Sequence, residues 1–334
     1  MKRSLKLTIV LGVKHGLLVS LVWIFLLNLI PAIYDAIWGE KIINDVVSTV
    51  IGNETNPNKI ALNIYFWEKS NFVSPYTYYQ KTPELLRNIG IYKIEGEYRW
   101  FLRPTFYPTP VSWILHSKLA NCEEYARVFV FIMTHAGVKA RIVRAPGEDH
   151  AWAEYYYNGI KIVFDPSTVG PIVDPKKFAE GRHWSYVESV DMFNPADRID
   201  VSDEYIKRGK LIVKISKRNT PVKGATVVVY STYLMKRYPD RYRSPRKVLE
   251  QISDENGMAT FLLGENEYLL KIKKCYMGFL CLITERKAYV KVDDTSIVDV
   301  DFSTARLSNG TIFLMLIGIF GMLIIFWKKR RRKQ

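Results

Sequence analysis

Two long apolar runs stand out in the pattern of hydrophobic and polar positions, at residues 16–34 and 312–327. The first run carries no charge and, at about 1.5 Å per residue in a helix, nearly spans a hydrocarbon core of about 30 Å. The second run is shorter and is followed by basic residues from Lys328 to Lys333. We therefore predict two transmembrane helices. A cleaved signal peptide is the alternative for the first run, and a buried core helix is the alternative for the second.

Between these runs the pattern changes twice, which predicts an α+β chain with two folded domains. A mixed α/β domain is expected at residues 59–208, and an all-β domain at residues 209–304. Residues 1–34 are expected to form a cytoplasmic N-terminus and a membrane helix, residues 35–58 a juxtamembrane segment, and residues 305–334 a second membrane helix with a basic cytoplasmic tail. No internal repeat interrupts this organisation.

The juxtamembrane segment has apolar residues at helical spacing, which are Ile42, Ile43, Val46, Val47 and Val50. This pattern predicts a helix that lies either on the folded domain or on the bilayer surface. The sequence Asn53-Glu54-Thr55 follows and has the form of a glycosylation sequon.

The mixed domain begins with two predicted helices, at residues 59–70 and 83–89. A proline-rich passage then leads to a helix that should start near Pro110, with Val111, Ile114, Leu115 and Leu119 on its buried side. Residues 123–135 form the strongest helical pattern, with Ala126, Phe129, Val130 and Met133 as the apolar stripe. Gly137 is a natural stop for that helix.

Two strands follow, at residues 151–157 and 160–165, and the dipeptide Asn158-Gly159 joins them. Asn-Gly between alternating strands is a strong signal for a two-residue hairpin. Tyr157 should then pair with Ile160, and Trp152 with Asp165. A slip of one residue would move every side chain to the opposite face, so this register can be checked.

The all-β domain shows short strand patterns separated by turn residues, at residues 211–216, 225–231, 259–264, 267–274, 281–292 and 296–302. This pattern predicts a β-sandwich. The sequence is similar to that of small immunoglobulin-like or prealbumin-like modules of cell-surface proteins, which commonly act as spacers or binding modules. A basic stretch, residues 236–247, interrupts the pattern and is interpreted as a solvated loop rather than a loop that binds a partner.

The net charge of +15 would suggest a nucleic-acid partner if the basic residues lay in one groove. Many of them instead lie outside the apolar runs, at Lys2, Arg3, Lys6, Lys14 and residues 328–333. Basic residues that flank membrane helices stay in the cytoplasm. We therefore expect a protein of the cell membrane with both termini cytoplasmic, its main domains extracytoplasmic, and no nucleic-acid partner.

Cys122 directly precedes the strongest helical pattern and so should lie at a helix N-terminus. The partial positive charge of unpaired N–H groups at this position stabilises a thiolate, which is the form that attacks a carbonyl carbon. Glu123 and Glu124 oppose the effect, so a reactive thiolate would need a cationic partner. The alternative is that Cys122 is a small buried hydrophobic residue.

His150 and Asp165 supply the other groups that a cysteine nucleophile requires. In the predicted hairpin register, His150 is diagonal to Asp165 on the same face of the sheet, within reach of a long side chain. His150 could accept the thiol proton, while Asp165 could hold the imidazole tautomer. Each residue alone has an ordinary structural explanation, but the three together indicate a catalytic triad of Cys122, His150 and Asp165.

The segment that carries these residues resembles the transglutaminase-like cysteine enzyme superfamily, over about residues 60–205. NCEEYA is similar to the family's cysteine-helix motif, HAGVKARIV to its helix-to-strand passage, DHAWAEYY to its histidine strand and FDPS to its aspartate motif. HWSYVESVD and DVSDEYIKRG are similar to its closing segment. The resemblance implies a papain-like cysteine core, triad roles for Cys122, His150 and Asp165, and chemistry on amide bonds.

Two departures from the family limit what the resemblance implies. Crosslinking transglutaminases usually carry Trp directly after the cysteine, where this chain has Glu123, and the calcium sites of the animal enzymes are not recognisable. Peptide N-glycanases share a phrase similar to DHAWAEYY, yet their zinc-binding cysteine pairs are absent. We therefore expect no metal and no cofactor. The oxyanion hole should use the Cys122 backbone N–H and one upstream side chain, for which Trp113 and His116 are the candidates.

Cys275 and Cys281 are the other two cysteines, and they flank Tyr-Met-Gly-Phe-Leu. A hairpin centred on Gly278 would place them directly opposite each other, and an oxidising exterior would allow a disulfide. Two buried free thiols are an equally good interpretation of the sequence.

These features together predict a membrane-anchored extracytoplasmic cysteine enzyme that acts on a protein or peptide substrate through a thioester. Hydrolysis and transfer share that intermediate, and the missing Trp favours a protease or amidase over a crosslinking enzyme. The alternative is a non-catalytic cell-surface module that keeps the fold while the β-sandwich binds partners.

Overall fold

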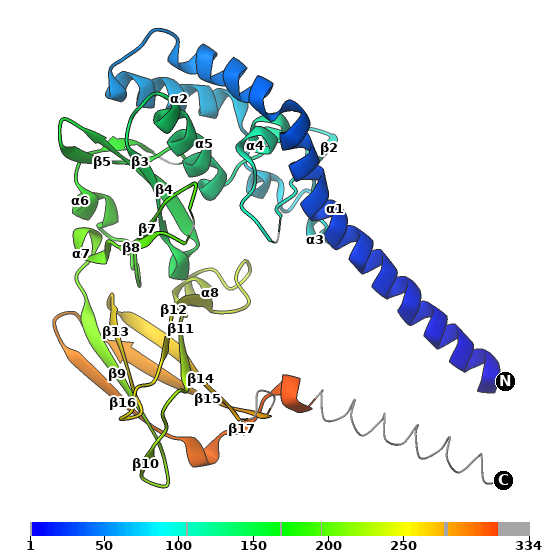
Figure 1. Cartoon of the computed structure of the whole chain (residues 1–334), viewed down its shortest axis with the longest axis vertical. Coiled ribbons are helices and arrows are strands. Elements are labelled where there is room, and N and C mark those ends of the chain that lie inside the picture. The colour runs from blue at the N-terminus through cyan, green and yellow to red at the C-terminus, as the bar shows by residue number, and fades with distance from the viewer. Residues whose placement is uncertain (1, 105, 168, 195, 277–279, 313–334) are drawn as a thin grey trace. The chain divides into compact units, whose positions relative to one another are not determined.

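A computed structural model describes residues 2–104, 106–167, 169–194, 196–276 and 280–312 of the chain (Figure 1). The chain divides into two compact units that are not continuous in sequence. The N-terminal unit comprises the chain up to Val143, Ala151–Pro175 and Ser189–Arg198. The C-terminal unit comprises Arg144–His150, Lys176–Glu188 and the chain from Ile199 on.

The first helix, α1 (Lys2–Ile51), continues without a break from the apolar run into the predicted juxtamembrane segment. Pro31 lies inside it. The side chains of Ile42, Ile43, Val46 and Val47 pack against the core of the N-terminal unit, and Val50 is buried in that core. This part of α1 therefore lies on the folded domain, which decides between the two placements that the helical spacing allowed.

Within the described residues, α1 contains one stretch that is long and apolar enough to cross a membrane, Ser20–Ile51. Length and composition alone support this stretch either as a membrane anchor or as a signal sequence. The predicted C-terminal membrane helix at residues 312–327 lies outside the described residues, apart from Ile312.

The helices predicted in the first part of the mixed domain are present. Asn56 caps α2 (Pro57–Asn71) by accepting bonds from the backbone N–H groups of Asn58 and Lys59. The elements that follow are η1 (Pro75–Tyr78), α3 (Glu84–Asn88), β1 (Ile91–Ile94), β2 (Glu97–Trp100) and α4 (Val111–Ser117). Val111, Ile114 and Leu115 of α4 are buried, as the apolar spacing predicts.

Helix α5 (Cys122–His135) packs beside α2 and against a six-stranded sheet. The strand order is β6 (Val169–Ile172), β5 (Ile160–Asp165), β4 (His150–Tyr157), β3 (Ala140–Ala145), β7 (Glu188–Val190) and β8 (Arg198–Asp200). Phe129 of α5 stacks on Phe164 of β5, with ring centroids 4.3 Å apart. The apolar stripe of α5 therefore faces this sheet, and Cys122 is the first residue of the helix. Figure 1 also shows the short helices α6 (Pro175–Ala179) and α7 (Ser202–Tyr205).

The β4–β5 hairpin has the predicted register, because Tyr157 pairs with Ile160 and Ala153 pairs with Phe164. Asn158 and Gly159 have φ angles of +51° and +75°. A two-residue turn with both central residues at positive φ suits the right-handed twist of the strands, and Asn-Gly adopts it readily. The Asn-Gly signal therefore predicts correctly how residues 153–157 pair with residues 160–164.

Two sheets form the β region of the C-terminal unit. One contains β10 (Thr220–Pro221), β9 (Gly209–Lys217), β13 (Met258–Leu263) and β16 (Thr295–Asp301), with β16 parallel to β9. The other contains β12 (Arg246–Ile252), β11 (Thr226–Ser231), β14 (Asn266–Tyr276), β15 (Leu280–Val290) and β17 (Arg306–Leu307). Alternate residues of both sheets form one core, including Val213, Phe261, Val229 and Leu270. This arrangement is a β-sandwich.

The basic stretch at residues 236–247 differs from the predicted loop. Its first residues end α8 (Tyr233–Arg237), and Arg246 and Lys247 begin strand β12. The strand was missed because charged and polar residues dominate its sequence, RKVLEQI, in which Val248 is the buried residue. Such a strand lacks the alternation of apolar and polar residues that predicts a strand. Its neighbour β11 supplies the apolar face that the strand itself lacks.

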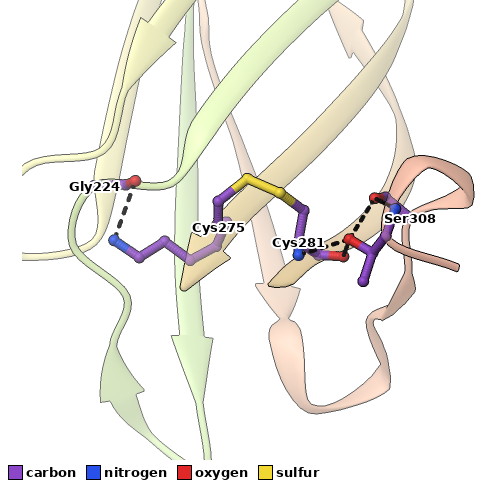
Figure 2. Close-up of a disulfide and its surroundings, with 6 residues drawn as sticks. Gly224, Cys275, Cys281 and Ser308 are labelled. Carbon is purple, nitrogen blue, oxygen red and sulfur yellow. Dashed lines mark hydrogen bonds between the residues drawn. A yellow bond between two sulfur atoms is a disulfide. The ribbon is translucent and has the colours of Figure 1, made fainter. Parts of the chain in front are cut away.

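Cys275 and Cys281 form a disulfide between β14 and β15 (Figure 2). They are direct partners in the strand register, with Cα atoms 4.0 Å apart. Thr311 Oγ1 accepts a bond from the backbone N–H of Cys281, and Cys281 O accepts one from the N–H of Ser308, so the chain after β17 is attached to this hairpin. The structure therefore decides between a disulfide and two thiols, although Gly278 itself lies outside the described residues.

Candidate functional site

Cys122 is the first residue of α5, as the sequence predicts, and it is partly buried. Asn121 caps the helix, because its side chain accepts bonds from the backbone N–H of Glu123 at 3.0 Å and of Glu124 at 3.4 Å. Glu124 Oε2 in turn accepts a bond from the backbone N–H of Asn121 at 3.1 Å. This reciprocal capping box fixes the first turn of α5, and therefore fixes where the Cys122 side chain leaves the helix.

The two carboxylates beside Cys122 are each paired with an arginine. Arg103 donates two bonds to Glu124, from Nε at 2.8 Å and from Nη2 at 3.1 Å. Arg127 Nη2 lies 3.5 Å from Glu123 Oε1 one turn along the helix. Burial raises the pKa of the Glu124 carboxyl, and the neighbouring Arg103 counteracts part of that rise. The negative charge that would oppose a thiolate at the start of α5 is therefore offset.

Arg103 is a residue of the candidate site that sequence reasoning missed. It lies in the proline-rich passage before α4, where no helical or strand periodicity assigns a partner to it. Its forked guanidinium suits a two-point contact with a carboxylate, which a lysine could not reproduce. The signal that could have found it is the adjacent pair Glu123-Glu124 at a helix start, which requires a nearby cation.

Asp165 is the last residue of β5 and is fully buried. Its Oδ1 accepts bonds from the backbone N–H of Ser167 at 3.0 Å and from Ser167 Oγ at 2.6 Å. These two bonds hold the plane of the carboxylate. Because β4 and β5 are antiparallel, the start of β4 and the end of β5 lie at the same end of the hairpin, opposite the Asn-Gly turn.

His150 is the first residue of β4 and is partly buried. Cys122 and Asp165 belong to the N-terminal unit, whereas His150 is the last residue of the short stretch Arg144–His150 that belongs to the C-terminal unit. The chain returns to the N-terminal unit at Ala151. The predicted hydrogen-bonded triad of Cys122, His150 and Asp165 therefore stays a prediction, and its histidine lies where the chain passes from one unit to the other.

The two oxyanion-hole candidates both lie on α4. Trp113 is 8% exposed, whereas the ring of His116 stacks on Tyr34 of α1 at 4.2 Å between centroids. Both line a cavity of about 400 Å³, together with Glu97, Arg99, Trp100, Ser117 and Lys118. The choice between Trp113 and His116 stays a prediction.

Comparison with known proteins gives one family match. Residues 91–166 match the family described as the transglutaminase-like superfamily. No curated protein matches the chain. The match includes Cys122, His150 and Asp165.

Among solved structures, a shaft pilin, SpaA, from Lactobacillus rhamnosus GG is 10% identical, with 28% of this chain and 48% of that chain covered at a TM-score of 0.23. GBS52, the minor pilin of Streptococcus agalactiae, is 13% identical, with 42% and 66% covered at a TM-score of 0.23. Rad4–Rad23 crosslinked to undamaged DNA is 13% identical, with 60% and 47% covered at a TM-score of 0.30.

The chain spans about half the length of the first of these structures, and TM-scores this low do not establish a shared fold. The family match is more specific, because it lies on α5, β3, β4 and β5, which carry the candidate site. The chain therefore contains a transglutaminase-like domain with the general fold of a cysteine enzyme, followed by a largely β-sheet region.

Proposed function

We propose that this protein is a cysteine enzyme that cleaves or transfers amide bonds of a protein or peptide substrate through a thioester at Cys122. The Cys122 thiolate attacks the amide carbon, and the protonated His150 gives its proton to the leaving amine. Water or a second amine then attacks the thioester, with His150 as the base, and Cys122 leaves as the thiolate. Asp165 holds the imidazole tautomer and stabilises the imidazolium.

The observation that supports this proposal most directly is the environment of Cys122. A cysteine is the first residue of a capped 14-residue helix, inside the segment that matches the transglutaminase-like superfamily. Its two acidic neighbours are paired with Arg103 and Arg127. The partial positive charge at the helix N-terminus therefore acts on the sulfur with the opposing charge offset.

Labelling with iodoacetamide near pH 6 tests the proposal on the full-length protein, because an activated thiolate reacts fast at a pH where an ordinary thiol does not. We expect rapid modification at Cys122, identified by peptide mapping, and loss of the modification in Cys122→Ser. Replacing both Cys275 and Cys281 by serine should leave the labelling rate unchanged, because these residues bond to each other at the turn end of the β14–β15 hairpin. Slow labelling of Cys122 would instead favour a non-catalytic surface module.

We further propose that the domains face the outside of the cell, with both termini in the cytoplasm. The apolar stretch of α1 and the disulfide between Cys275 and Cys281 support this topology, since disulfides persist in oxidising compartments. Protease added to intact cells should cut within residues 52–304 and spare epitope tags at both ends. Loss of either tag would contradict the topology, and a tag on each end of the same chain serves as the internal control.

A further inference from the structure

The segment that precedes His150, residues 144–149, comprises the last two residues of β3, the short helix η2 (Pro146–Glu148) and Asp149, and contacts within the C-terminal unit hold it at three points. We call these residues the His150 loop. The first point is an ion pair at its start, where Arg144 Nε donates to Glu188 Oε1 at 2.6 Å. The other two points are Glu148 and Asp149, the two residues immediately before His150.

Glu148 provides the buried point. It is 8% exposed, and its carboxyl accepts bonds from the backbone N–H of Ser185 at 3.0 Å, from Ser185 Oγ at 2.6 Å and from Ser231 Oγ at 2.9 Å. Ser231 is the last residue of β11 in the sandwich. A buried carboxyl that lost its hydrogen-bond donors would destabilise the fold. These three bonds therefore fix the position of the loop closely.

Close packing accompanies these bonds at Gly147. A Cβ atom added there would lie 2.9 Å from Val248 Cγ2, 3.1 Å from Ser231 Cβ and 3.3 Å from Ser185 Cβ. Val248 belongs to β12, the strand that the sequence pattern did not predict. The loop therefore approaches the sandwich as closely as a glycine allows, and a side chain at residue 147 would displace it.

Asp149 provides the exposed point. Its Oδ2 accepts bonds from Tyr242 OH at 3.2 Å and from Arg246 Nη2 at 3.0 Å. Its φ angle is +53°, a left-handed conformation that is unfavourable for a residue with a Cβ atom. Such a conformation persists where the surroundings enforce it, and here it redirects the chain immediately before His150.

We propose that Glu148 and Asp149 are positioning residues for His150, through which the β-sandwich holds the imidazole in the orientation that serves Cys122. This proposal rests on the catalytic roles assigned above. The sandwich then contributes to the enzyme, because the bonds of Ser231, Tyr242 and Arg246 set the direction in which the chain enters β4. Neither positioning residue takes part in the transfer of a proton or of the acyl group.

The exposed pair allows a test that does not threaten folding, because both side chains of Asp149 and Arg246 are exposed by about two fifths, at 39% and 43%. Exposed ion pairs contribute little to global stability. We expect Asp149→Arg and Arg246→Asp each to lower the rate of Cys122 labelling by iodoacetamide at pH 6 by about 10- to 100-fold, the range that displacement of a catalytic group produces. The double exchange, Asp149→Arg with Arg246→Asp, should restore the rate by reforming the pair.

The pH dependence separates positioning from a general structural effect. Near pH 10 even an ordinary thiol is largely ionised, so both single variants should label there at the wild-type rate. Lys247→Glu is the matched control, because Lys247 is the next residue on β12 and pairs with Glu250 rather than with the His150 loop. It should label as the wild type does at both pH values.

Each outcome has a distinct meaning. Slow labelling of the wild type at pH 6 overturns the proposed function itself. Fast labelling of the wild type together with unchanged rates in both single variants overturns the positioning role and leaves the proposed function standing. Equal losses at pH 6 and pH 10, or a double exchange that restores nothing, also overturn the positioning role, because the defect would then be structural.

Discussion

Cys122→Ala is expected to abolish turnover and covalent labelling while leaving the fold intact. Removal of the nucleophile of a triad lowers kcat by about 10⁶-fold in other enzymes, and no neighbouring cysteine can replace it here. The side chain is small and partly buried, so its loss creates little cavity. The measurement is product formation on a substrate identified from cells, with circular dichroism as the check on folding. Full activity of Cys122→Ala would contradict the enzyme assignment.

Asp165→Asn is the matched comparison, because it changes the orientation of the base rather than the nucleophile. Ser167 donates two bonds to Asp165 Oδ1, and the oxygen of an asparagine can accept both in the same place. In the proposed triad, the amide then replaces Oδ2 and offers His150 a donor where the imidazole needs an acceptor. We expect some labelling to survive while kcat falls by about 10⁴-fold, as occurs when a triad histidine is held in the wrong tautomer.

Much of the N-terminal unit could be predicted because its elements are specified locally. The Asn158-Gly159 turn determined the hairpin register, and the apolar spacing of α5 determined its buried face. The juxtamembrane part of α1 had two possible environments, since the same stripe of isoleucine and valine suits a bilayer or a protein core. Contact with the core decides between them, and no local pattern contains that information.

The part of the candidate site that could not be predicted depends on pairs that are distant in sequence. Arg103 is 21 residues from Glu124, and Arg246 is 97 residues from Asp149. Both arginines lie in passages without periodicity, so each had an equally good interpretation as a solvated side chain. The cysteine, histidine and aspartate were recognised because their order along the chain is itself a signal, whereas the residues that support them have no fixed order.

The basic stretch at residues 236–247 illustrates the consequence for the domain organisation. Interpreted as a solvated loop that interrupts the β-sandwich, it has no contact with the segment that carries the candidate site. In the structure its Tyr242 and Arg246 donate hydrogen bonds to Asp149, the residue before the candidate base. The division of the chain into compact units follows the same contacts, because Arg144–His150 groups with the sandwich although the family match continues through it.

The buried carboxyl of Glu148 predicts a pH-dependent stability for the C-terminal unit. Burial raises the pKa of Glu148 to about 7, and the bonds from Ser185 and Ser231 counteract only part of that rise. A carboxyl whose pKa is raised on folding binds its proton more tightly in the folded state. Its contribution to stability is therefore fully present below the pKa of about 4 of the unfolded chain, and it is lost as the pH rises through 7.

Glu148→Gln is expected to remove this dependence. Between pH 5 and pH 8 the wild type should lose about 2 to 3 kcal/mol of unfolding free energy through this group. The glutamine has no charge to bury, and its amide can donate to the hydroxyls of Ser185 and Ser231 while its oxygen accepts from the Ser185 N–H. Amide hydrogen exchange of β11 and β12 at the two pH values measures the difference. Glu180→Gln, an exposed change in the same unit, should keep the wild-type dependence. If the wild type and Glu148→Gln lost equal protection between pH 5 and pH 8, Glu148 would not be the group responsible for the pH dependence. The bonds of Glu148 would then hold the His150 loop equally well at either pH.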